Sequence, residues 1–131
     1  MRFYRDVILP GMESGDIIEY ELQKPYTLQP GFTHDDIKVR PVTYVADFYY
    51  VDSVGHAHVI DVKGTADSLA KCKRKLFWYR YPELDYRWVT YVKKYGGWRD
   101  WDEVQQLRRS EKRARKQKEE TNNVEEQENN V

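Results

Sequence analysis

Hydrophobic and polar residues alternate most regularly from Tyr44 to Gly64, in the stretch YVADFYYVDSVGHAHVIDVKG. Alternation of this kind is typical of half-buried β-strands. It predicts two strands, over residues 42–52 and 57–63, with the even-numbered residues from Val42 to Tyr50 on one face of the first strand. Gly55 lies between them and readily takes a left-handed conformation, so the two strands should form a hairpin.

Segments before the hairpin have helical and then strand-like spacing. Phe3, Val7 and Ile8 predict a short N-terminal helix that Pro10 limits and that Gly15 ends. The next segment, IIEYELQKPYTL, partly alternates and predicts a strand. It is followed by QPGFTHDD, in which the Pro-Gly pair favours a turn, so we expect a loop there.

After the hairpin, apolar positions recur with a period near that of a helix. The segment TADSLAKCKRKLFWYRYP predicts a helix with several candidate N-caps and an end before Pro82. Its apolar face would hold four residues: Leu69, Cys72, Leu76 and Tyr79. A strand is expected over residues 86–92, then a glycine turn, and then a second helix from Asp100, with Glu103 in a capping box, to about Lys118.

The order helix, strand, hairpin, helix, strand, helix predicts an α/β fold, with a small mixed β-sheet and a central hairpin flanked by helices. Residues 1–107 would form this domain. Residues 108–131 would form a charged extension, first basic and then acidic. The extension has too few apolar residues to pack, so we expect it to be largely disordered.

Charge is distributed in three blocks, although the net charge is zero. Residues 1–62 carry 5 basic and 10 acidic side chains, residues 63–118 carry 17 and 7, and residues 119–131 carry 0 and 5. The basic middle block is typical of a protein that binds a polyanion, although a solvated helical surface has the same composition.

Composition excludes several classes of protein. No apolar run approaches ~20 residues, so no membrane partner is expected. Cys72 is the only cysteine, which excludes intramolecular disulfides and cysteine-rich zinc sites and fits a reducing cytoplasm.

The hairpin carries acidic residues at positions where strands usually avoid them. With a three-residue loop, Asp52 pairs with His56, so Asp47 lies opposite Asp61 and Lys63 follows on the same face. Two facing carboxylates destabilise a sheet, typically by a few tenths to about 1 kcal/mol. A divalent cation between them would make the pair stabilising instead. Mg²⁺ is usually held in this way, by one or two carboxylates and several waters.

Two alternatives to a metal site remain open at this point. Lys63 would equally neutralise the two acids in a purely structural ion pair. A two-residue loop would place Asp47 opposite Val62 and would separate the two carboxylates.

The same residues match a known motif. Asp47 lies fourteen residues before Asp61, which begins the triplet Asp61-Val62-Lys63. This spacing resembles the motif of the PD-(D/E)xK nuclease superfamily, with Ala46 in place of the proline. The surrounding segments ELQKPYTLQPGF, VTYVADFYY, VIDVKGT, KCKRKLFWYRYP and YGGW resemble a small phage-borne family of that superfamily, over roughly residues 2 to 110. Its members are similar to phage endonucleases that cut branched DNA, including Holliday-junction resolvases.

The resemblance implies a metal-dependent endodeoxyribonuclease with a restriction-endonuclease-like fold. Mg²⁺ or Mn²⁺ would be held by Asp47, Asp61 and the Val62 carbonyl, and Lys63 would assist the attacking water. The substrate would be DNA, with a four-way junction as the leading candidate. A homodimer would act in the cytoplasm of a phage-infected bacterial cell, during recombination or replication.

Such nucleases commonly carry a further metal-facing Glu on a helix upstream of the segment that matches RFYRDVILP. No counterpart is visible in this sequence. Glu21 or Glu19 would substitute for it, because both lie on one face of the strand before the hairpin. Gln23 matches the ELQ segment, where it would contact a water or phosphate or cap strand backbone groups.

Phosphate binding would depend on basic residues after the motif: Lys71, Lys73, Arg74, Lys75, Lys93 and Lys94. The first four lie on the predicted helix, whose N-terminal amide groups also favour phosphate. Three tryptophans would either stack on unpaired bases or pack in the core or at a dimer contact: Trp78, Trp98 and Trp101. The histidines His34, His56 and His58 are scattered and are not expected to bind a metal.

Other functional classes are consistent with the same features. Without the upstream Glu, the chain would be a catalytically incomplete DNA-binding protein on a nuclease scaffold. A structural phage protein, whose charge blocks serve assembly, would not bind DNA at ~100 mM salt. In either DNA-binding case, the acidic residues from Glu119 to Glu128 would fold over the basic stretch and compete with DNA.

Overall fold

The alternating stretch forms an antiparallel hairpin of β4 (Val42–Asp52) and β5 (Ala57–Val62). Tyr50 pairs with His58 and Phe48 with Ile60, which is the predicted register. Gly55 takes a left-handed φ of 96°, and the Asp52 N–H donates to the His56 carbonyl at 2.9 Å. The three-residue loop is therefore confirmed over the two-residue alternative.

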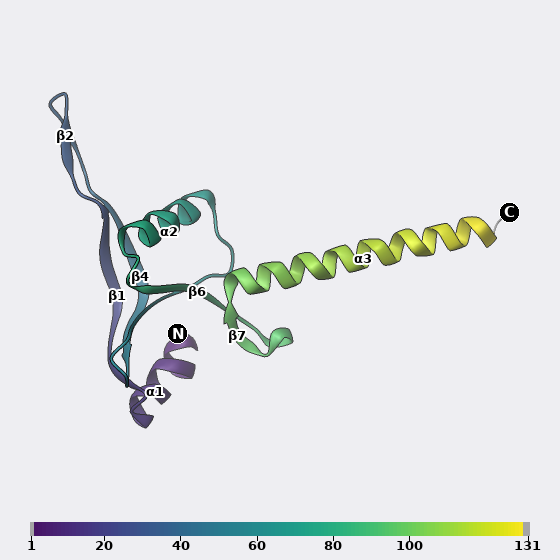
Figure 1. The fold of residues 1–131 in the computed structure, drawn as a ribbon, viewed down its shortest axis with the longest axis horizontal. Coiled ribbons are helices and arrows are strands. Elements are labelled where there is room, and N and C mark those ends of the chain that lie inside the picture. Colours follow the sequence, from purple (N-terminus) through teal and green to yellow (C-terminus); the bar gives the residue numbers. More distant parts are fainter. Residues whose placement is uncertain (1, 130–131) are drawn as a thin grey trace. The chain divides into compact units, whose positions relative to one another are not determined.

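A five-stranded mixed sheet surrounds this hairpin in the computed structural model, which describes residues 2–129. Its strand order is β1-β4-β5-β6-β7, with β1 over Ile17–Gln29, β6 over Asp85–Val92 and β7 over Gly97–Asp100. Strands β1, β4 and β5 are antiparallel, whereas β5 and β6 are parallel and are connected through helix α2 (Ser68–Arg80) (Figure 1). The predicted α/β class is confirmed, because a parallel pair requires a crossover such as α2.

The N-terminal helix does not end at Pro10. A π-helical turn, η1 (Tyr4–Ile8), leads into α1 (Leu9–Ser14), which ends at Gly15 with φ 85°. Pro10 lies directly after the π-helical turn, at the second residue of α1, so the helix continues past it. Phe3 packs on Phe48 of β4 with ring centroids 4.9 Å apart, which joins this helix to the sheet.

Helix α2 is packed through one aromatic residue. Phe77 is fully buried and contacts four tyrosine rings at centroid distances of 4.3–5.8 Å: Tyr26, Tyr44, Tyr81 and Tyr86. The prediction of a buried face formed by Leu69, Cys72, Leu76 and Tyr79 is wrong, since all four are exposed. A neighbouring face is buried instead because Phe77 fits between the tyrosines, which helical spacing alone does not indicate.

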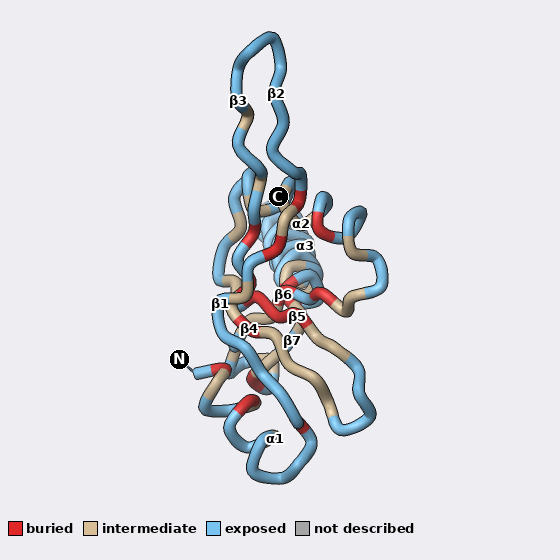
Figure 2. Tube along the Cα trace, turned by 90° about the vertical axis from the view of Figure 1, so that its left-hand side faces the viewer, coloured by how far each residue is buried: buried red, intermediate tan, exposed pale blue. Residues whose placement is uncertain are grey.

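The predicted loop at QPGFTHDD contains a second hairpin. Strands β2 (Phe32–His34) and β3 (Ile37–Val39) pair with each other in a separate two-stranded sheet. This ribbon extends from the ends of β1 and β4, and its residues are exposed except for half-buried Val39 (Figure 2). We call residues 32–39 the β2–β3 ribbon.

The chain divides into two compact units between Val89 and Thr90. The second unit contains the 3-10 turn η2 (Lys93–Tyr95) and helix α3 (Trp101–Asn129). The predicted boundary at residues 107/108 lies inside α3, and the segment that we expected to be disordered is helical to Asn129. Arg, Lys, Gln and Glu are good helix formers and dominate this segment.

This continuous helix also changes the hypothesis about the acidic residues. They follow the basic stretch along one straight element, so they do not fold back over it. No helix within residues 2–129 has the length and apolarity needed to cross a membrane.

Candidate metal and nucleic-acid site

The two acids of the hairpin lie at the point where β4 and β5 separate. Backbone pairing between these strands ends at Phe48–Ile60. Beyond it, the Val62 N–H donates to Asp47 Oδ2 at 2.9 Å, and the Asp47 N–H donates to Asp61 Oδ1 at 3.4 Å. Each carboxylate therefore bonds the backbone of the other strand, which holds both at one site.

Lys63 completes this group. Its Nζ lies 2.7 Å from Asp61 Oδ2 and 5.3 Å from the centre of the Trp88 ring. The Lys63 N–H donates to the Val89 carbonyl at 2.9 Å, so β6 fixes the backbone of the motif. Asp61 is only 3% exposed, which is compatible with a charged group because Lys63 neutralises it.

The second carboxylate, on Asp47, is less well compensated. Burial raises its pKa, and the neighbouring Asp61 carboxyl raises it further. The hydrogen bonds from Val62 and Gln23 act in the opposite direction but do not outweigh these effects. Burial and the Asp61 charge likewise raise the pKa of Tyr44, so its hydroxyl stays neutral beside the acids. The charged form of Asp47 is therefore disfavoured at this site, where two carboxyl groups lie beside the one ammonium group of Lys63.

These residues fit a hard divalent cation. Asp47 and Asp61 supply carboxylate oxygens, and the extra negative charge favours a cation. Val62 lies beside them, since its N–H donates to Asp47 Oδ2, and its carbonyl would be the backbone ligand. One or two carboxylates with several waters are a usual Mg²⁺ donor set. Within residues 2–129, no three His, Cys, Asp or Glu side chains are arranged to hold a metal, so waters and backbone oxygen would supply the other ligands.

The candidates for a third acid do not join this group. Glu21 pairs with Tyr49 across β1 and β4, and its carboxylate lies 3.8 Å from the Lys24 ammonium. Glu19 pairs with Val51, further toward the β4–β5 turn. Glu21 is thus paired with a lysine, and its role as a third acid stays a prediction.

Gln23 does reach the acidic pair. Its amide Nε2 donates to Asp47 Oδ1 at 3.4 Å. Its backbone takes a left-handed φ of 53° within β1, a conformation that costs a non-glycine residue of order 1–3 kcal/mol. Gln23 therefore combines backbone strain, which is often found at functional sites, with a hydrogen bond to one of the two acids.

A cleft of about 400 Å³ opens next to Lys63. Its lining comes from β4, β6, the connection between β5 and α2, and the first turns of α2: Thr43, Tyr44, Val45, Lys63, Asp67, Leu69, Ala70, Lys73 and Trp88. Asp67 is the N-cap of α2, because its Oδ1 accepts the Ala70 N–H at 2.8 Å. Lysines from two sides make this cleft suited to a phosphate group.

The four basic residues predicted on α2 do not form one surface. Lys73 and Arg74 are half-buried on the inner side of the helix. The Lys73 ammonium donates to the Thr43 carbonyl at 3.1 Å, and the Arg74 guanidinium stacks 4.0 Å from the Trp88 ring centre. Lys71 and Lys75 are exposed. Only Lys73 of this set lines the cleft.

The remaining candidates lie apart from the acids in the first unit or belong to the second unit. Trp78 donates its Nε1–H to the Tyr86 carbonyl at 3.3 Å and stacks on Arg74. In the second unit, Lys94 is paired with Glu111 at 2.9 Å and Lys93 is exposed. Trp101 is buried, and Trp98 stacks edge-on against Tyr91.

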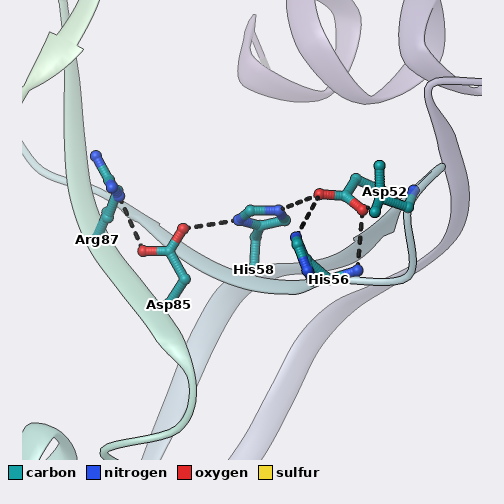
Figure 3. A network of polar contacts seen from close by, with 6 residues as sticks. Asp52, His56, His58, Asp85 and Arg87 are labelled. Atoms are coloured by element: carbon teal, nitrogen blue, oxygen red, sulfur yellow. Dashed lines mark hydrogen bonds and ion pairs between the residues drawn. The ribbon is translucent and has the colours of Figure 1, made fainter.

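Sequence reasoning missed a polar cluster near the turn of the hairpin (Figure 3). His58 lies between two carboxylates, with Nδ1 2.8 Å from Asp85 Oδ2 and Nε2 2.9 Å from Asp52 Oδ2. Asp85 also accepts from Arg87, and Asp52 accepts backbone N–H groups of the turn. Burial alone would lower the pKa of His58, but its two acidic partners outweigh burial and raise it. The hydrogen bond from His58, together with those from the backbone of the turn, lowers the pKa of Asp52 to about 2.

A family of known sequences matches most of the chain. The family described as "Protein of unknown function (DUF1064)" matches residues 1–97, which include the hairpin, the cleft and α2. No curated protein matches the chain.

Proposed function

The chain belongs to the DUF1064 family, and we propose that it is a metal-dependent endodeoxyribonuclease that cuts branched DNA. One observation carries this proposal: Asp47 and Asp61 share one site with Lys63 Nζ, 2.7 Å from Asp61, at the edge of a cleft that a second lysine lines. A purely structural ion pair would need only one acid for Lys63, whereas here two carboxyl groups share the site.

Asp47, Asp61 and the Val62 carbonyl would hold Mg²⁺ or Mn²⁺. The bound ion lowers the pKa of water and neutralises charge on a phosphate oxygen. Lys63 would orient the attacking water and stabilise the negative charge that develops on the phosphate. Gln23 would keep the Asp47 carboxylate in position, and Lys73 would bind a neighbouring phosphate in the cleft.

In the overall reaction, the water oxygen forms a new bond to phosphorus and the bond from phosphorus to the 3′ oxygen breaks. The products are a 5′-phosphate and a 3′-hydroxyl, and the water's second proton passes to solvent. We further propose that a homodimer acts in the cytoplasm of an infected bacterial cell, because a junction requires two cuts.

The proposal is tested with labelled four-way junction and linear duplex DNA, incubated with the full chain and Mg²⁺, Mn²⁺ or EDTA. Cleavage in either metal, lost in EDTA and in Asp61→Asn, is the expected result. Asp52→Asn is the matched control, because it removes a carboxylate from the same hairpin outside the site. Absence of cleavage in both metals, with a folded protein, would refute the nuclease function.

A second function has an observation in its favour. The described residues include no third acid near Asp47 and Asp61, and Glu21 contacts Lys24 instead. A catalytically incomplete DNA-binding protein is therefore the alternative, and it predicts tight junction binding with no cleavage in either metal. No affinity for DNA at ~100 mM salt would favour a structural protein over both.

A further inference from the structure

The β2–β3 ribbon is a regular hairpin with a tight turn at its tip and closely spaced strands at its base. At its tip, Asp35 and Asp36 have positive φ values of 46° and 64°, as in a two-residue type I′ turn. At its base, a Cβ on Gly31 would lie 3.2 Å from Pro41 Cδ and from the Val39 carbonyl, so the two strands meet closely there. Such local construction indicates a fixed ribbon rather than a variable loop.

The ribbon adds little to the core of the protein. Phe32 is 47% exposed and Ile37 is 64% exposed. The register places Phe32, His34, Ile37 and Val39 on one face, and Thr33 opposite Lys38 on the other. A two-stranded ribbon is at best marginally stable alone. A partner that covers the apolar face would therefore explain why these residues are apolar.

We propose that the β2–β3 ribbon is a DNA-binding arm that lies in a groove of the duplex flanking the cleaved bond. Lys38 and Arg40 contact phosphates, and Phe32 and Ile37 lie against the bases. This inference rests on the proposed function, because it assumes that the cleft beside Lys63 holds a phosphate of the same DNA.

The first argument is continuity with the cleft. Arg40 and Pro41 lead directly into β4, and Thr43 and Val45 line the cleft. Lys73 bonds the Thr43 carbonyl, three residues from Arg40. A DNA strand that lies in the cleft and continues along β4 passes the base of the ribbon, where Arg40 adds a positive charge to those of Lys63 and Lys73.

The second argument is size. Paired strands lie about 4.8 Å apart and rise about 3.3 Å per residue, so the ribbon reaches roughly 16 Å from Pro41 to its tip. The major groove is about 12 Å wide and 8.5 Å deep, and it admits a two-stranded ribbon. Apolar side chains of such elements contact thymine methyl groups or insert between base steps.

The acidic tip provides a sharp test, because its charge has the wrong sign for phosphate. If the ribbon lies in a groove, Asp36 is repelled by both DNA backbones, and neutralising it must strengthen binding. If the ribbon contacts a protein or solvent, neutralising it leaves DNA affinity unchanged. Asn tolerates the left-handed conformation, so Asp36→Asn keeps the turn.

The experiment measures affinity of the full chain for a labelled four-way junction in EDTA, by fluorescence anisotropy at several salt concentrations. Phe32→Ser with Ile37→Ser should lower affinity roughly tenfold, as loss of base contacts does elsewhere. Its matched control is Val54→Ser, which changes a residue 78% exposed at the turn of the other hairpin. Thermal unfolding of each variant checks that the fold is intact.

Charge variants complete the design. Asp36→Asn should raise affinity roughly twofold or more, whereas Glu13→Gln, an equal charge change on α1, should not. Lys38→Gln should lower the slope of log affinity against log salt by about 1.

Each outcome decides one proposal. Unchanged affinity in both the apolar and the Asp36 variants overturns the DNA-binding arm, even if the wild-type protein cuts DNA. Ribbon-dependent binding without cleavage in Mg²⁺ or Mn²⁺ supports the arm and refutes the nuclease. No DNA binding by the wild-type protein refutes both.

Discussion

Replacing Asp47 with Asn should stabilise the protein and abolish its metal response. Asn keeps the shape of the side chain and removes one of two facing charges. Its amide oxygen still accepts the Val62 N–H, which donates to Asp47 at 2.9 Å in the wild-type protein. Its amide nitrogen takes the place of Oδ1, where it is a donor beside the Asp61 carboxyl group, and the Gln23 amide rotates so that its oxygen faces this new donor. If Asp47 served only to stabilise the fold, replacing it would not raise the stability of the protein.

The magnitude follows from two contributions. Loss of repulsion between facing charges is worth a few tenths to about 1 kcal/mol. A new hydrogen bond adds about 0.5–1.5 kcal/mol. We expect the free energy of unfolding at pH 7 to rise by about 1–2 kcal/mol. For a unit of this size, each kcal/mol raises the Tm by roughly 4–8 °C.

The pH dependence of this gain has a defined sign. The pKa of Asp47 is raised in the folded protein, so the folded state binds the proton more tightly than the unfolded chain does. As the pH falls through that raised pKa, wild-type Asp47 becomes neutral and gains stability relative to the variant. The advantage of Asp47→Asn should therefore shrink toward pH 4 and be largest at neutral pH.

Thermal unfolding followed by circular dichroism, with and without 10 mM Mg²⁺, is the assay. A cation bound at the site with a Kd of about 1 mM would stabilise the wild-type protein by roughly 1.4 kcal/mol at 10 mM, and would not stabilise Asp47→Asn. Asp52→Asn, on the same strand, should lose stability but keep the response to Mg²⁺. Lower stability of Asp47→Asn at pH 7, or equal stabilisation of both proteins by Mg²⁺, would refute the argument.

Three further outcomes follow from the same structure. The pKa of His58 is raised in the folded protein, so its contribution to stability is full below about pH 6.5 and is lost as the pH rises through the folded pKa. His58→Gln should remove this pH dependence of the free energy of unfolding, measured in urea between pH 5.5 and 9. An unchanged pH dependence would contradict the role of Asp52 and Asp85. Gln23→Gly should leave stability within about 1 kcal/mol, because relief of strain offsets backbone entropy, yet should slow DNA cleavage; full cleavage activity would exclude Gln23 from the site. Phe77→Ala should lower the free energy of unfolding by about 3–5 kcal/mol in a denaturant titration, and a loss below 1 kcal/mol would show that the tyrosines close the cavity.

The hairpin could be predicted in detail because its determinants are local. Alternation places the faces, and Gly55 in a three-residue loop specifies which residues face each other. That register places Asp47 near Asp61, and Lys63 follows two residues later. The candidate site is thus largely a property of one stretch of sequence.

Other features depend on contacts between distant residues, which periodicity does not report. Helix α2 has an exposed face that contains Leu69 and Tyr79 and a buried face that contains Phe77. Both faces carry apolar residues at helical spacing, so only the position of four tyrosines from β1, β4, β6 and the end of α2 decides which is covered. The same packing turns Lys73 into the cleft and leaves Lys71 outside.

The sequence by itself determined the central hairpin, its register and the pairing of two acids with a lysine, because neighbouring residues encode turns and strands. The tertiary structure alone decided that Gln23 reaches Asp47 from another strand, that Glu21 contacts Lys24 and that His58 lies between Asp52 and Asp85. The contacts of Gln23 with Asp47 and of His58 with Asp85 join residues 24 and 27 positions apart, so they are set by how the strands are placed beside one another. The contacts of Glu21 with Lys24 and of His58 with Asp52 are local, but they depend on how each side chain is turned, which the alternation of the strands does not specify.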